Sequence, residues 1–383
     1  MSVTRHLLIT NDYLPKTGGI QVYLHELWRR LPSGEAAILT ANSDPGAKEF
    51  DAKSEVVIER IPEGTLFLPT RKIRKYIEEA IARHDPELVI LDPAWPLGLL
   101  GPKLSRPYGV ILHGAEVTIP GRLPFTGAWL RYILRNAELA ICAGTYPEAE
   151  ARRNAAEFMP AVVQVPPGVD LERFVPLTEA QREKTRAELD IPKGALVVAS
   201  YSRLVPRKGM DVLIEASVQL KNEFPNLLVM IGGKGRDAKR LNNLATKLNA
   251  PVRFLGRVSN DLLPAWLGAS DIFVMACQSR WFGLEQEGFG MVFGEAAAAG
   301  IPQVAGRSGG SHEVVRHGQT GLIVERPKSV TQLADAMRQL LADSELRESM
   351  GAESRKMAEE NYSWDALAAV LANGLAPYEG GTQ

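Results

Sequence analysis

The sequence predicts an α/β protein with two doubly wound, Rossmann-like domains that face a central cleft. Three observations support this fold class. Short and almost continuously apolar β-rich runs alternate with amphipathic segments, a pattern typical of parallel sheets covered by helices on both faces. The alternating series occurs twice along the chain. The length of 383 residues also exceeds what one hydrophobic core usually organises.

The first series predicts an N-terminal domain over residues 1–170. Its strands are expected at residues 6–10, 36–40, 55–61, 88–92, 108–112 and 139–143. Helix-like segments lie between most of these runs, for example at residues 20–31 and 71–83. Such alternation requires each pair of parallel strands to be joined by a crossover helix.

The second series predicts a C-terminal domain over residues 171–362. Its strands are expected at residues 196–200, 227–231, 252–255, 272–276, 302–305 and 321–324, and its helices at 210–222, 236–248, 291–299 and 330–341. The proline-rich segment 166–176 interrupts the periodicity and marks the boundary between the domains. Residues 363–383 form a final helical segment that we expect to cross back to the first domain.

Composition narrows the range of partners. The formal net charge of −1 provides no whole-molecule field for nucleic acid, so no nucleic-acid partner is expected. Cys142 and Cys277 lie in apolar runs, which favours buried, reduced thiols and a cytoplasmic location. Because no apolar stretch approaches eighteen residues, any membrane contact would be peripheral.

The strongest motif joins two glutamates through a glycine-rich turn. Glu287 precedes Gly288 and Gly290, and Glu295 follows within a helix that should begin near Gly290. Free amides at a helix N-terminus suit diphosphate oxygens. The two carboxylates could accept hydrogen bonds from hydroxyls at opposite ends of an extended ligand. The alternative is a charged loop followed by an amphipathic helix.

A second motif places basic side chains after the strand at 196–200. Arg203 offers a planar fork of donors and Lys208 a point charge, which together could clamp a pyrophosphate and stabilise charge on a departing nucleoside diphosphate. The alternative is a solvated basic turn.

Two further motifs follow strands of the first domain. The turn containing Gly19, with Gln21 behind it, could bring backbone close to a diphosphate or a sugar, although such a turn is common for purely structural reasons. His113 ends the strand at 108–112 and could bind the transferred sugar or position an acceptor hydroxyl, while the alternative is a structural histidine. Scattered histidines and cysteines, and the lack of an Asp-x-Asp pair, indicate no metal site.

Taken together, the motifs resemble the family 4 glycosyltransferases of the GT-B fold. The matching segments are GGIQ (18–21), HGAE (113–116), PPGVD (166–170), SRLVPRKG (202–209), the stretch 287–295, AGRSGG (305–310) and HGQTGLIV (317–324). The opening TNDYLPKTGGIQVYL and the run SRLVPRKGMD look most like the actinobacterial mannosyltransferases that use GDP-mannose on phosphatidylinositol mannosides.

This resemblance implies a retaining hexosyl transfer, with a nucleotide sugar, GDP-mannose by preference, as donor and no tightly bound cofactor. Carried onto matching positions, Arg203 and Lys208 would hold the diphosphate, Glu295 the ribose, and Glu287 the hexose, with His113 beside the sugar. The remaining donor-binding residues would be Gly19, Gly288, Phe289, Gly290, Met291 and Val292, with Arg257 and Val258 flanking the base.

The acceptor is expected on the N-terminal domain. A basic cluster opens its amphipathic helix and could attract anionic headgroups, and an apolar loop follows His113. The candidate acceptor or membrane residues are Gln21, Arg71, Lys72, Arg74, Lys75, Ile119 and Phe125. They imply peripheral contact with the inner face of the plasma membrane, and the alternative is a solvated charged face.

Three functional hypotheses follow. The first is transfer of mannose to a glycolipid or polyol hydroxyl. The second is a family 4 transferase that uses UDP-glucose or another nucleotide sugar on a soluble acceptor. The third, from another class, is a non-catalytic module that binds a nucleotide sugar.

Overall fold

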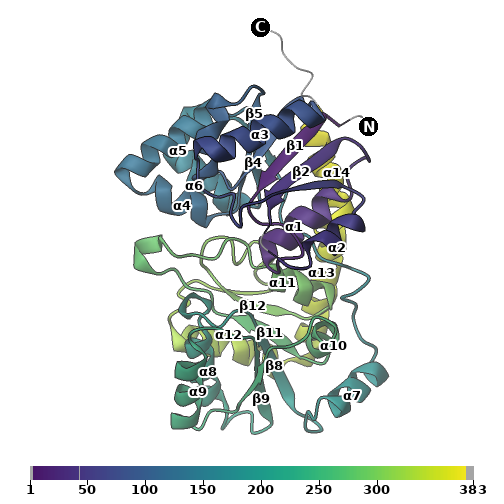
Figure 1. Cartoon of the computed structure of the whole chain (residues 1–383). Helices are drawn as coiled ribbons and strands as arrows, with labels where there is room; N and C mark the ends of the chain where they lie inside the picture. Colours follow the sequence, from purple (N-terminus) through teal and green to yellow (C-terminus); the bar gives the residue numbers. More distant parts are fainter. Residues whose placement is uncertain (1–2, 43, 377–383) are drawn as a thin grey trace. The chain divides into compact units, whose positions relative to one another are not determined.

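Two compact units make up the chain in the computed structural model, which describes residues 3–42 and 44–376. One unit contains residues up to Gly168 together with the segment that begins at Trp364, and the other runs from Val169 to Ser363. Residues 377–383 of the expected C-terminal segment lie outside the described residues. Figure 1 shows a parallel sheet flanked by helices in each unit.

The N-terminal unit is built on a seven-stranded parallel sheet with the order β3-β2-β1-β4-β5-β6-β7. Its strands are β1 (His6–Thr10), β2 (Ala36–Ala41), β3 (Val57–Ile61), β4 (Leu88–Asp92), β5 (Tyr108–Leu112), β6 (Leu139–Cys142) and β7 (Ala161–Gln164). The central strands β1, β4 and β5 are buried along their whole length, which explains their continuously apolar sequences.

Helices cover this sheet and connect its parallel strands. They are α1 (Gly19–Trp28), α2 (Ala47–Ala52), α3 (Arg71–His84), the 3₁₀ helix η1 (Leu97–Lys103), α4 (Ala115–Gly121), α5 (Pro124–Asn136), α6 (Thr145–Ala155), η2 (Ala156–Phe158) and α14 (Trp364–Leu375). The helix α14 belongs to this unit because Leu375 accepts a 2.6 Å hydrogen bond from the hydroxyl of Thr4.

The second unit contains a six-stranded parallel sheet with the order β10-β9-β8-β11-β12-β13. Its strands are β8 (Leu196–Tyr201), β9 (Leu227–Gly232), β10 (Val252–Gly256), β11 (Ile272–Met275), β12 (Gln303–Gly306) and β13 (Gly321–Val324). Its helices are α7 (Glu179–Glu188), η3 (Pro206–Lys208), α8 (Met210–Leu220), α9 (Ala238–Lys247), α10 (Leu263–Gly268), η4 (Trp281–Gly283), α11 (Met291–Ala298), α12 (Val330–Ala342) and α13 (Ser344–Asn361).

The predicted α/β fold with two doubly wound sheets is confirmed. Each expected strand is present, with ends that differ from the expected ones by at most two residues. The sequence reading missed β7, whose run AVVQ is partly exposed at the sheet edge and so lacks the apolar signature of the buried strands. Cys142 and Cys277 are buried free thiols, as expected, and burial raises the pKa of each to about 12.

Strand order determines where ligands can bind in such sheets. Sequential order reverses between β1 and β4 in one sheet and between β8 and β11 in the other. Ligands of open α/β sheets bind outside the carboxyl ends of the strands at these switch points. The loops after β1 and β4, and those after β8 and β11, are therefore the places to look for a site.

Candidate active site

The basic turn after β8 holds Lys208 in a buried position next to a carboxylate. Lys208 ends the short helix η3, and its Nζ lies 2.9 Å from Oε2 of Glu287. Gly209 follows with a φ of 67°, and a Cβ there would lie only 2.0 Å from the carbonyl oxygen of Ala276. Glycine is thus required at position 209, and it lets the turn lie against the chain that leaves β11.

Glu287 forms ion pairs with two cationic side chains. Besides Lys208, the Nε of Arg207 lies 3.3 Å from Glu287 Oε2. Burial alone would raise the pKa of Glu287, but the charges and hydrogen bonds of Lys208 and Arg207 hold it below its ordinary value. The sequence reading selected Lys208 and Glu287 but did not predict that they pair, and it missed Arg207.

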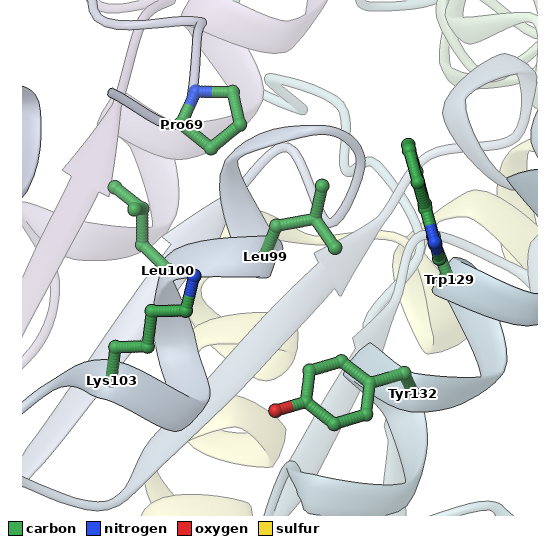
Figure 2. A pocket seen from close by; sticks show the side chains of 6 residues that line it. All are labelled: Pro69, Leu99, Leu100, Lys103, Trp129 and Tyr132. Carbon is green, nitrogen blue, oxygen red and sulfur yellow. The ribbon is translucent and has the colours of Figure 1, made fainter. Parts of the chain in front are cut away.

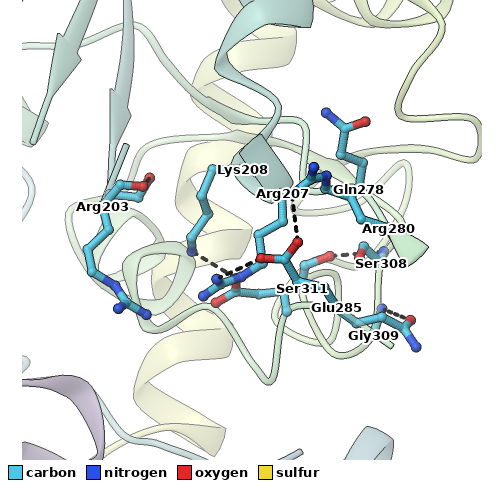
Figure 3. Close-up of polar contacts among 12 residues, drawn as sticks. Arg203, Arg207, Lys208, Gln278, Arg280, Glu285, Ser308, Gly309 and Ser311 are labelled. Atoms are coloured by element: carbon cyan, nitrogen blue, oxygen red, sulfur yellow. Dashed lines mark hydrogen bonds and ion pairs between the residues drawn. The ribbon is translucent and has the colours of Figure 1, made fainter. Parts of the chain in front are cut away.

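Arg203 differs from Lys208 in its surroundings. It is exposed, and within residues 3–42 and 44–376 its side chain has no hydrogen bond or ion pair. In the view of Figure 3, its side chain and that of Lys208 extend from the same turn after β8. The turn therefore has two cations in different states. The ammonium of Lys208 is neutralised by Glu287, and the guanidinium of Arg203 is available to an anion.

The helix α11 begins where the sequence predicted. Gly290 is its N-cap with a φ of 84°, and no side chain caps the helix. The half-buried Met291 and Val292 form its first turn, where backbone amides have no partner within the helix. This end of α11 therefore presents donors and a positive dipole to whatever lies beside it.

Glu295 lies one turn into α11 in an unusual state. Its Oε2 atom is buried and has no hydrogen-bond partner among the described residues. Burial raises the pKa of Glu295 to about 7, and the opposing charge of Arg173 offsets this only in part. A carboxyl group with an unused acceptor atom is suited to bind a ligand hydroxyl.

A second loop fixes the backbone around Glu287. Gly310 donates its amide to the Glu287 carbonyl at 2.9 Å, and Gly309 donates to Gln286 Oε1 at 3.0 Å. The hydroxyl of Ser279 also donates to Gln286 Oε1, at 3.1 Å. Gly309 has a φ of 55°, and a Cβ there would lie 2.2 Å from the Glu287 carbonyl oxygen. The glycines after β12 therefore clamp the turn that carries Glu287.

The other expected donor-binding residues in this unit lie on neighbouring segments. Gly288 and the buried Phe289 connect Glu287 to α11, and the Phe289 ring lies 6.0 Å from that of Tyr362. Arg257 is exposed directly after β10, while Val258 is half-buried.

His113, at the end of β5, is paired with an acidic residue that the sequence reading missed. Its Nε2 donates to Oδ1 of the buried Asp92 at 2.8 Å, and the Thr10 hydroxyl donates to Oδ2 of Asp92 at 2.6 Å. Burial would lower the pKa of His113, but the charge of Asp92 and its hydrogen bond raise it above the ordinary value. An acidic residue that ends a buried apolar strand was the available signal for Asp92.

Gly19 and Gln21 belong to the start of α1. Gly19 is exposed as the first residue of the helix, and Gln21 is buried and donates from Nε2 to Asp12 Oδ1 at 2.7 Å. Asp12 also accepts from Lys16 at 2.6 Å. Asp12 follows β1 and was likewise not singled out from the sequence.

Six of the seven candidate acceptor or membrane residues are exposed in the N-terminal unit, whereas Gln21 is buried. Lys72 is ion-paired with Glu63, and Lys75 lies 3.7 Å from Glu79. The other four are exposed, namely Arg71, Arg74, Ile119 and Phe125.

Two absences concern only residues 3–42 and 44–376. In that part of the chain, no group of three or more His, Cys, Asp and Glu side chains is placed to hold a metal ion. The same residues contain no helix that combines the length and apolar character needed to cross a bilayer.

Comparisons with known proteins agree with this architecture. Residues 17–173 match the family model described as Glycosyltransferase Family 4, and residues 181–357 match the one described as Glycosyl transferases group 1. Among solved structures, the Anabaena protein HepE in complex with UDP is similar, with a TM-score of 0.81 and 21% identity over 97% of this chain and 99% of that one.

Two relatives are similar over nearly their entire length. A GDP-mannose-dependent alpha-(1-6)-phosphatidylinositol monomannoside mannosyltransferase of Mycobacterium tuberculosis is 37% identical, covering 97% of this chain and 98% of the relative. A GDP-mannose-dependent monoacylated alpha-(1-6)-phosphatidylinositol monomannoside mannosyltransferase of Corynebacterium glutamicum is 34% identical, covering 98% and 99%. With its paired parallel sheets and both family matches, this chain is a glycosyltransferase and belongs to family 4 of the GT-B fold.

Proposed function

We propose that this protein transfers a mannosyl residue from GDP-mannose to a hydroxyl of a phosphatidylinositol mannoside-type glycolipid. The chain is 37% and 34% identical, over nearly its whole length, to two mannosyltransferases described in those terms. This identity supports GDP-mannose as the donor and a phosphatidylinositol mannoside as the acceptor. The observation that carries the proposal is the buried Lys208, which is held at Glu287 just ahead of the uncapped N-terminus of α11.

The diphosphate of the donor would lie between Arg203, Lys208 and the first turn of α11. Arg203 is the available cation, and the free amides of Met291 and Val292 would donate to phosphate oxygens. As the bond between the hexose and the diphosphate breaks, negative charge builds on the leaving group. Preorganised cations and amides stabilise such charge without further rearrangement.

Other groups of the site would contact the rest of the nucleotide sugar. Glu295 would accept a hydrogen bond from a ribose hydroxyl through its unpartnered Oε2. Glu287, with the backbone from Gly288 through Phe289 to Gly290, would bind the hexose. Arg257 and Val258 would flank the base.

The N-terminal unit would supply the acceptor side. His113, whose pKa is raised by the charge and hydrogen bond of Asp92, would hydrogen-bond the sugar, and Gly19 and Gln21 would border the diphosphate and the acceptor. With retention of configuration, the acceptor oxygen bonds to the anomeric carbon on the face that the diphosphate leaves. The acceptor proton then passes to a departing phosphate oxygen.

A peripheral position on the inner face of the plasma membrane would bring the enzyme to a lipid acceptor. Arg71 and Arg74 would attract anionic headgroups, by roughly 1 kcal/mol each near the surface, and Ile119 and Phe125 would enter the interface. Lys72 and Lys75 contribute less, because Glu63 and Glu79 already neutralise them.

The test is a donor panel followed by product analysis. Calorimetric titration with GDP-mannose, UDP-glucose and UDP-GlcNAc should show tight binding of GDP-mannose alone. Incubation of purified protein with GDP-mannose and a phosphatidylinositol mannoside should then yield a product heavier by one hexose. Preferential binding of a uridine nucleotide sugar, or donor binding with no turnover on any phosphoinositide acceptor, would reject this assignment.

A further inference from the structure

The helix α5 has an aromatic stripe on the face opposite its buried one. Phe125, Trp129 and Tyr132 recur at the spacing that aligns side chains on one side of a helix, and they are 85%, 54% and 47% exposed. The helix packs on the unit through its other face, which contains Gly127, Leu130, Ile133 and Leu134. A contiguous exposed apolar surface of this kind marks an interaction site.

A hollow of about 530 Å³ lies beside this stripe. Its walls come from α5, from η1 and from the segment before α3, and they consist of Pro69, Leu99, Leu100, Lys103, Trp129 and Tyr132. In the view of Figure 2, Leu99 lies between Leu100 and Trp129. The Trp129 ring is held in place by stacking on Trp95, with centroids 5.8 Å apart and an interplanar angle of 26°. The hollow is therefore a formed apolar feature.

The hollow has one cationic residue in its wall. Lys103 is the charged residue among its walls, and within the described part of the chain its amine has no ion pair. The exposed Arg71 and Arg74 follow the wall residue Pro69 in sequence. An apolar hollow with the cation Lys103 in its wall complements a molecule with an apolar tail and an anionic head.

We infer that this hollow binds one fatty-acyl chain of the glycolipid acceptor, with Lys103 facing the phosphate of its headgroup. The inference rests on the proposed function, because a phosphatidylinositol-type acceptor supplies both the acyl chain and the phosphate. The stripe from Phe125 to Tyr132 extends for about 10 Å along α5 and presents aromatic side chains on one face, as an amphipathic helix at a bilayer interface does. The stripe would lie at the membrane interface while the acyl chain leaves the bilayer and enters the hollow.

Monomeric lipids separate an acyl-chain site from a surface that merely adsorbs to bilayers. Phosphatidylinositols with two butanoyl or two octanoyl chains, kept below their micelle concentrations, would be titrated calorimetrically into the protein without any nucleotide sugar. Each methylene group that enters the hollow should tighten binding about fourfold. Equal affinities for the two lipids, or the absence of binding, would overturn the inference.

Filling the hollow provides the decisive variant. Leu99→Trp keeps the wall apolar but occupies its space, so the advantage of octanoyl over butanoyl lipid should fall at least fivefold. The matched control is Leu262→Trp, which changes a leucine that is 54% exposed in the other unit and should keep the full advantage. Lys103→Ala should weaken binding of both lipids by the same factor. A retained chain-length dependence in a folded Leu99→Trp protein would contradict the inference.

This experiment distinguishes the two proposals. Chain-length-dependent binding without mannosyl transfer would reject the proposed function and leave a lipid-binding hollow. Transfer that proceeds without chain-length dependence would reject the hollow alone.

Discussion

Replacement of Lys208 tests the core of the proposed site, because this side chain belongs to a buried ion pair and is proposed to stabilise the leaving diphosphate. Its Nζ lies 2.9 Å from Glu287 Oε2, and both side chains are buried. Loss of one partner of a buried ion pair costs about 3–5 kcal/mol. In Lys208→Ala we expect the lower end, about 3 kcal/mol, because Arg207 still faces Glu287 at 3.3 Å.

The effect on transfer should exceed what this loss of stability explains. Removal of one preorganised group that stabilises charge in the transition state typically lowers kcat by about 10²–10³. We expect at least that loss in Lys208→Ala, measured as GDP release under conditions where urea unfolding shows the protein to be folded. Lys239→Ala, an exposed lysine on α9, is the control and should stay within twofold of the unaltered protein.

A double variant separates the two roles of Lys208. In Lys208→Ala combined with Glu287→Gln, no unpaired buried carboxylate remains. The free energy of unfolding should therefore recover to within about 1 kcal/mol of the original value. Transfer should not recover, because Lys208, one of the cations proposed at the leaving diphosphate, is still missing and the carboxylate proposed to bind the hexose is also gone. Turnover within threefold of the unaltered enzyme in a folded Lys208→Ala protein would refute the reasoning.

The remaining predictions concern single groups around the site. Glu295→Gln should stabilise the protein by roughly 1–3 kcal/mol at pH 8 and have little effect at pH 5. The reason is that the folded-state pKa of Glu295, about 7, exceeds the unfolded value. The native state is therefore destabilised relative to the unfolded state as the pH rises from the unfolded pKa to the folded pKa. The same variant should weaken donor binding about tenfold. An effect of Glu295→Gln on the free energy of unfolding that is equal at pH 5 and pH 8 would contradict the raised pKa of Glu295. Asp92→Asn should destabilise the protein more at pH 5.5 than at pH 9. The raised pKa of His113 gives stability that is present below its unfolded pKa and lost as the pH rises through the folded one. Urea unfolding at the two pH values checks this. If Asp92→Asn destabilised the protein equally at both pH values, the contribution of Asp92 to stability would come from the hydrogen bond of Thr10 and not from the charge of His113. Gly309→Ala should destabilise by about 1–3 kcal/mol and lower kcat, because its Cβ would meet the Glu287 carbonyl oxygen; an unaffected melting temperature would contradict this clash.

Much of the architecture could be predicted from local patterns. Buried parallel strands carry continuous apolar runs, so β1, β4, β5 and β8 were evident, whereas the partly exposed edge strand β7 was not. Chemistry-bearing residues after strands were also found, because the carboxyl ends of parallel strands lie along one edge of a sheet.

What the sequence alone determined was the fold class, the family resemblance and the positions of groups on single loops, such as Gly290 at the start of α11. Only the tertiary structure decided which of these groups pair. Glu287 lies 79 positions after Lys208, and Asp92 lies 21 before His113, so no local pattern links either pair. The sequence reading placed Ile119 and Phe125 in an apolar loop, but they lie on the helices α4 and α5, and no local pattern showed which face of α5 would be buried. Burial and ion pairing depend on long-range packing, and packing determined that Phe125, Trp129 and Tyr132 face outward.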